Sequence, residues 1–102
     1  MTRVDILQTA IDIYGISAQE DMLLEEMAEL QKAILKLRRL GKHIFEDWAV
    51  KNASEKIDLA VKYVLEEIAD VQIMLDQMRL IYGDTAEQEA FKLDRLRKRL
   101  EG

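Results

Sequence analysis

The sequence contains no cysteine, no proline and a single histidine, His43. Without cysteine it forms no disulfides, thiolate zinc sites or iron–sulfur clusters, and one histidine excludes a metal site built from several. Apolar runs stay well short of the roughly 20 residues that span a membrane. The first residues lack the pattern of a signal peptide. We therefore expect a soluble, cytoplasmic protein with no membrane partner.

The charge balance is acidic, with 20 acidic and 15 basic residues among 102, a formal net charge of −5. This balance argues against nucleic acid as a partner, because the phosphate backbone repels an acidic surface. The length predicts one domain over residues 1–102. A chain of this size buries only about two-thirds of its unfolded surface, so a subunit partner would thicken its core.

Good helix formers dominate the composition and predict an all-α fold. Glycines at 15, 41 and 83 are placed to end helices. Ser17 with Glu20, and Asp84 with Glu87, fit capping boxes at the start of helices. The expected helices cover about residues 2–14, 17–40, 53–82 and 85–100. Between the second and third lies the least regular segment, residues 42–53, which contains Phe45 and Trp48. We expect a bundle of about four helices built on an antiparallel pair of long helices.

A short repeat occupies the middle of the two long predicted helices. Residues 24–31 (LEEMAELQ) and 65–72 (LEEIADVQ) are identical at five of eight positions. At about 100° per residue, Glu26 falls inside an apolar arc that includes Met22, Met27, Leu30 and Ile34. Glu29 falls at the edge of this arc. The same register places Glu67 inside an arc with Ala60, Tyr63 and Met74, and Asp70 at its edge.

Carboxylates on the apolar faces of two helices are energetically unusual. A buried, unpaired carboxylate costs several kcal/mol, and four of them would repel each other and raise their pKa values. A divalent cation relieves this repulsion, and an all-oxygen ligand set suits Mg²⁺, Mn²⁺ or Ca²⁺. A single Glu-x-x-Glu pair most often lies on a solvated helix face. From the helical wheels alone, metal binding and a solvated acidic face therefore both stay open.

The motif Glu25-Glu26-x-x-Glu29 followed by Glu67-x-x-Asp70 resembles the E-E-x-x-E … E-x-x-D signature of the MazG-like all-α nucleoside triphosphate pyrophosphohydrolases. The flanking EEMAELQKA and EEIADVQIMLDQM are similar to that family, especially to its small single-domain members from phages and Gram-positive bacteria. The resemblance covers roughly residues 14 to 82. The gap between Glu29 and Glu67 is longer than in the compact members, and residues 42–53 with an extended third helix account for it.

The resemblance implies Mg²⁺-dependent hydrolysis of a nucleoside triphosphate to a monophosphate and pyrophosphate, with Mn²⁺ as a possible substitute. It implies Glu26, Glu29, Glu67 and Asp70 as metal ligands. Glu25 and Glu26 are the expected catalytic residues, with Glu25 near the attacking water. Gln19 and Lys32 are candidates for substrate contact.

Two other classes of function remain open from the residues. One is a non-catalytic helical interaction module, in which the carboxylates pair with basic residues of another chain. The other is a divalent-ion-binding protein without turnover. In each case wide apolar faces on the long helices predict a homo-oligomer, a dimer or a dimer of dimers.

Overall fold

The computed structural model describes residues 1–43 and 53–102, and these form four helices. They are α1 (Arg3–Tyr14), α2 (Ile16–His43), α3 (Ala53–Tyr82) and α4 (Ala86–Glu101). No strand occurs in these two ranges, so the predicted all-α class is confirmed. No helix within them is long and apolar enough to cross a membrane. Phe45 and Trp48 lie outside the described residues.

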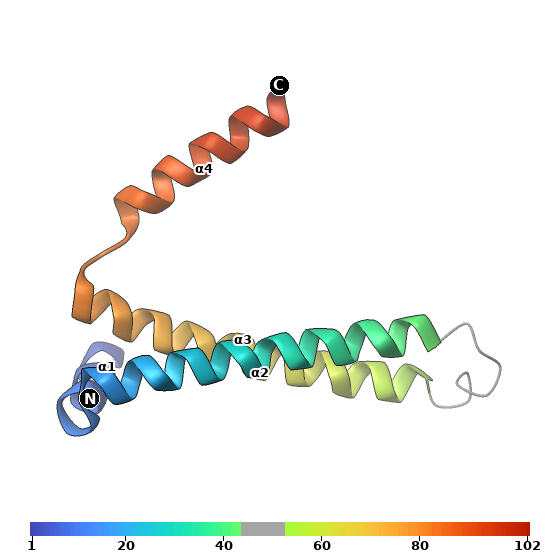
Figure 1. Cartoon of the computed structure of the whole chain (residues 1–102), viewed down its shortest axis with the longest axis horizontal. Coiled ribbons are helices and arrows are strands. Elements are labelled where there is room, and N and C mark those ends of the chain that lie inside the picture. The colour runs from blue at the N-terminus through green and yellow to red at the C-terminus, as the bar shows by residue number, and fades with distance from the viewer. Residues whose placement is uncertain (44–52) are drawn as a thin grey trace.

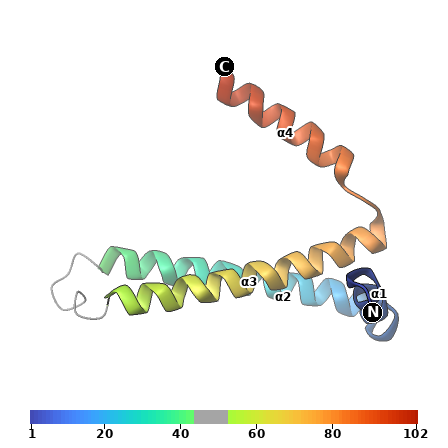
Figure 2. The same cartoon turned by 180° about the vertical axis from the view of Figure 1, so that it is seen from behind.

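Helices α2 and α3 lie side by side along most of their length and run in opposite directions (Figure 1). Helix α1 packs against the end of this pair where α2 begins and α3 ends, whereas α4 extends away from the other three helices (Figure 2). At that same end the Tyr82 hydroxyl donates a hydrogen bond of 2.7 Å to Glu20 Oε2. This bond joins the last turn of α3 to the first turns of α2.

The apolar core is thin and lies where α1 meets the long helices and along the contact between α2 and α3. Its buried apolar members are Leu7, Ile11, Ala60 and Met74. On α2 a narrow row of half-buried residues faces α3, namely Leu23, Glu26, Leu30, Ala33, Leu37 and Leu40. The wider apolar arc expected on α2 is wrong in part, because its flanking residues are about 40% exposed: Met22, Met27 and Ile34. A single partner helix covers less of α2 than its apolar arc spans.

The beginning and end of α1 follow from local backbone chemistry. The Thr2 hydroxyl accepts from the Asp5 amide at 3.1 Å, and the Asp5 carboxylate accepts from the Thr2 amide at 2.9 Å. This capping box satisfies amides that the first turn leaves free. Gly15 ends the helix, as predicted, at a φ of 89°. That angle favours glycine, because a side chain there would be strained.

Three other predicted helix ends are wrong. Helix α2 continues through Gly41 to His43, since an isolated glycine in a helix costs only about 1 kcal/mol. Helix α2 also begins at Ile16, which places Ser17 in its first turn and not at the cap. At α4 the capping position belongs to Thr85, not Asp84, and the Thr85 side chain makes no capping bond.

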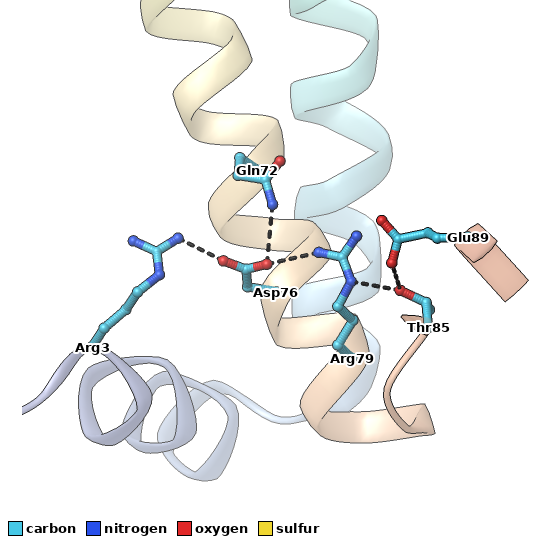
Figure 3. A network of polar contacts seen from close by, with 6 residues as sticks. All are labelled: Arg3, Gln72, Asp76, Arg79, Thr85 and Glu89. Carbon is cyan, nitrogen blue, oxygen red and sulfur yellow. Dashed lines mark hydrogen bonds and ion pairs between the residues drawn. The ribbon is translucent and has the colours of Figure 1, made fainter. Parts of the chain in front are cut away.

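A polar network around Asp76 explains why Thr85 does not cap α4 (Figure 3). Asp76 on α3 accepts from Arg3 of α1 at 2.6 Å, from Gln72 at 3.0 Å and from Arg79 at 2.7 Å. Arg79 Nε also donates to the Thr85 hydroxyl at 2.9 Å, which in turn donates to Glu89 at 2.7 Å. The hydrogen bond from Arg3 is the main reason why the pKa of Asp76 is lowered. The network therefore links α1 and the start of α4 to α3.

We predict that Asp76→Asn lowers the free energy of unfolding by about 1 kcal/mol at neutral pH, because it removes charge-assisted bonds to two arginines. The pKa of Asp76 is lowered in the fold, so this stabilisation is present above its ordinary value of 3.8. It is lost as the pH falls through the lowered value. Urea unfolding at neutral pH and well below pH 3.8 measures both effects.

The matched control is Asp94→Asn, which removes only contacts to Arg97 and Lys98 within α4. We expect a smaller loss from it. An equal loss from both variants would show that the bridge between α1 and α3 contributes nothing of its own.

Candidate metal centre

Three carboxylates meet where the middle of α2 contacts the middle of α3. Glu26 comes from α2, and Glu67 and Asp70 come from successive turns of α3. One carboxylate oxygen of each lies within 4.8 Å of the others. The spacing of three between Glu67 and Asp70 places both on one side of α3. We call these residues the acidic trio.

The trio lies partly inside the contact between the helices. Glu26 and Glu67 are half-buried, whereas Asp70 is exposed at the rim. The Glu67 Oε2 atom is buried and accepts no hydrogen bond from the described residues. A buried acceptor without a donor costs about 1–3 kcal/mol. A cation bound by the trio would remove that cost.

The surroundings of Glu26 disfavour its charged form. Its pKa is raised, first because burial removes water from the carboxylate and then because the negative charge of Asp70 lies close. The nearby carboxyl group of Glu67 and the charge of Glu25 act in the same direction. These are the effects expected where carboxylates share a site without a bound cation.

The structure does not bring every predicted site residue to this place. Glu29 lies outside the trio, half exposed, with one carboxylate oxygen 3.6 Å from Lys32 Nζ. It does line a surface hollow together with Lys32 and Glu67. Glu25 is exposed. Gln19 is buried on α2, about 10 Å before Glu26 along the helix.

Sequence reasoning missed Tyr63 as a candidate site residue. It was expected in the buried arc of α3, but it is 45% exposed and lines the same hollow as Glu29 and Glu67. Lys36 borders the hollow too. Its spacing of four from Lys32 places both lysines on one face of the helix that carries the acidic motif.

Comparisons with known protein families, with curated proteins and with solved structures found no match for this chain. The resemblance to MazG-like proteins therefore rests on the paired acidic motif and its flanking residues.

The donor set fits a hard divalent cation. All three ligands are carboxylates, and among the described residues no other group of acidic or histidine side chains gathers in the same way. Oxygen ligands suit Mg²⁺ and Mn²⁺, which commonly keep several bound waters. The exposed position of Asp70 leaves one side open to solvent and to a ligand.

We predict that Glu26→Gln raises the melting temperature of the metal-free protein by a few degrees at neutral pH. The pKa of Glu26 is raised above 4.5. Its protonated form therefore stabilises the fold at low pH, and this contribution is lost as the pH rises through the raised value. The wild-type protein should lose stability over that range, whereas the variant should not. Thermal unfolding followed by circular dichroism across this pH range measures the difference.

Added Mn²⁺ should stabilise the wild-type protein and the control variant Glu66→Gln, whose residue is exposed on α3. It should stabilise Glu26→Gln far less. Equal stabilisation of all three proteins by Mn²⁺ would place the cation elsewhere.

Proposed function

We propose that the protein is a Mg²⁺-dependent nucleoside triphosphate pyrophosphohydrolase, which releases pyrophosphate and leaves a nucleoside monophosphate. The acidic trio, drawn from two facing helices around a buried and unsatisfied carboxylate oxygen, is the observation that carries this proposal. The order of the motif, E-E-x-x-E followed by E-x-x-D, supports the same reaction by its resemblance to MazG-like enzymes. Cytoplasmic ribo- or deoxyribonucleotides are the substrate class.

Glu26, Glu67 and Asp70 hold the cation in this proposal, and Glu29 joins them from its place beside Glu67 in the hollow. When bound, a divalent cation neutralises the triphosphate and lowers the pKa of a coordinated water. Lys32, now paired with Glu29, is then free to contact a phosphate oxygen.

Glu25 takes the proton in this proposal. Its side chain is exposed, one residue before Glu26 on α2 and about 100° around the helix from it. The oxygen of water forms a bond to the α-phosphorus, and the bond from that phosphorus to the bridging oxygen breaks. Pyrophosphate leaves with the electron pair of that bond. No nucleophilic side chain is required, which agrees with a chain without cysteine.

We predict that alanine at Glu26, Glu67 or Asp70 lowers pyrophosphate release by at least about a hundredfold, with helical circular dichroism unchanged. A coupled assay for pyrophosphate over a panel of NTPs and dNTPs with Mg²⁺ measures this. Glu66→Ala, one residue from Glu67 and exposed, should retain wild-type activity. Wild-type rates in two of the three trio variants would refute this site.

Glu25→Ala should lose less activity than Glu26→Ala, because Glu25 points about 100° away from the face that carries the trio. The ratio of the two rates, measured at the same Mg²⁺ concentration, distinguishes proton transfer from cation binding. Equal losses would mean that both carboxylates bind the cation.

We also propose that the functional form is a homo-oligomer, a dimer or a dimer of dimers. The chain exposes 8060 Å², whereas a compact monomer of 11.9 kDa exposes about 6,000 Å². Its radius of gyration is 18.3 Å, against about 13 Å for a compact domain of this length. The excess of about 2,000 Å² exceeds the roughly 800 Å² that one partner buries in a standard interface.

Helix α4 contributes much of that excess. It has no buried residue and extends away from the other helices (Figure 1). Leu93, Leu96 and Leu100 form one apolar stripe on it and are 65%, 48% and 78% exposed. The exposed residues Met27 and Ile34, two turns apart on one side of α2, form a second uncovered surface. A second copy of the chain, which carries the same two surfaces, covers both in this proposal.

We predict that sedimentation at micromolar concentration gives a dimer or tetramer. Leu93→Lys with Leu96→Lys should weaken association at least tenfold, because charges in an apolar contact are costly. Gln88→Lys changes charge on another side of α4 and should not. A stable, fully active monomer would rule out this assembly.

A further inference from the structure

The hollow beside the acidic trio continues along the helix pair. One part, of about 210 Å³, lies next to Glu67 and Glu29 and is bordered by Lys32. A second part, also of about 210 Å³, is lined by Leu40, Leu59 and Ala60, with Lys56 at its edge. Lys36 and Tyr63 line both parts. We call the two together the α2–α3 groove.

The chemistry of the groove changes along its length. The end at the trio is acidic, and a bound divalent cation would offset most of its negative charge and offer open coordination positions to phosphate oxygens. The middle is basic, with Lys32 and Lys36 one helical turn apart. The far part is mainly apolar, and its lining includes the half-exposed Tyr63 ring. The groove thus offers a cation site, ammonium groups and an aromatic face in sequence.

Lys36 and Tyr63 contact each other at the junction of the two parts. The Lys36 Nζ atom lies 5.8 Å from the centroid of the Tyr63 ring, within the range of a cation–π contact. This contact is weak at an exposed position, about 0.5–1 kcal/mol. A phosphate is a stronger partner for an ammonium group, so an anionic ligand can draw Lys36 away and expose the ring.

We propose that the α2–α3 groove binds the nucleoside part of the substrate, with the base stacked on Tyr63 between Leu40 and Leu59, and with Lys36 turned from the ring to the phosphates. This assignment rests on the proposed function, because that function places the triphosphate at the trio. Charge complementarity selects the occupant: a ligand that is anionic at one end and planar and apolar at the other matches the order of groups. Inorganic polyphosphate would leave the apolar part unused.

Isothermal titration calorimetry with Mn²⁺ tests this with two kinds of ligand. One is inorganic tripolyphosphate, and the other is the set of α,β-methylene analogues of ATP, GTP, CTP and UTP. We expect at least one analogue to bind the wild-type protein about tenfold tighter than tripolyphosphate. This ratio corresponds to the binding free energy of one base stacked on an aromatic ring. Tyr63→Ala should remove that difference and leave tripolyphosphate affinity unchanged. Lys36→Gln should weaken both ligands.

The control is Tyr14→Ala, an exposed tyrosine on α1, which should bind every ligand like the wild type. The groove assignment is overturned if no analogue binds tighter than tripolyphosphate. It is equally overturned if Tyr63→Ala weakens both ligands alike or leaves the analogue unaffected. In those cases continued release of pyrophosphate by the wild type would show that the proposed reaction survives. If an analogue binds tightly and this depends on Tyr63, but the wild type releases no pyrophosphate from any NTP or dNTP, the proposed reaction is refuted and the groove assignment is supported.

Discussion

Two glutamates on the packing faces of a thin helical pair are the constraint on which the site depends. Glu26 and Glu67 occupy positions where α2 and α3 would otherwise place apolar side chains. Their placement costs stability. Burial and the charge of Asp70 raise the pKa of Glu26, and no described residue donates a hydrogen bond to the buried Glu67 Oε2. In our proposal a bound divalent cation would remove this cost, and its binding would stabilise the fold.

The inward position of these glutamates could be predicted from sequence, because it depends only on helical periodicity. Glu26 and Glu67 fall inside their apolar arcs, and the arcs of facing helices meet. The same reasoning was wrong for Tyr63, which is exposed, and it did not predict that Glu29 lies outside the trio. Both lie near the boundary of an arc, where the crossing of the two helices, and not the wheel, decides which side chains are covered.

Contacts between distant parts of the chain could not be predicted. Asp76 accepts a hydrogen bond from Arg3, which lies on a helix more than seventy residues earlier in the chain. Nothing in the local sequence pattern predicts that pairing. The extension of α2 through Gly41 has a similar cause, since packing on a neighbouring helix outweighs the small cost of one glycine. The sequence predicts Asp84 as the cap of α4, but Thr85 takes that position, and its hydroxyl is hydrogen-bonded to Arg79 and Glu89.

The central claim is that the acidic trio binds a divalent cation. Paramagnetic broadening of backbone amide signals by sub-stoichiometric Mn²⁺ tests it most directly. The account predicts that broadening centres on Glu26, Glu67 and Asp70 and leaves the exposed carboxylates Asp94 and Glu101 of α4 unaffected. Broadening centred on α4, or spread evenly over all exposed carboxylates, would contradict it.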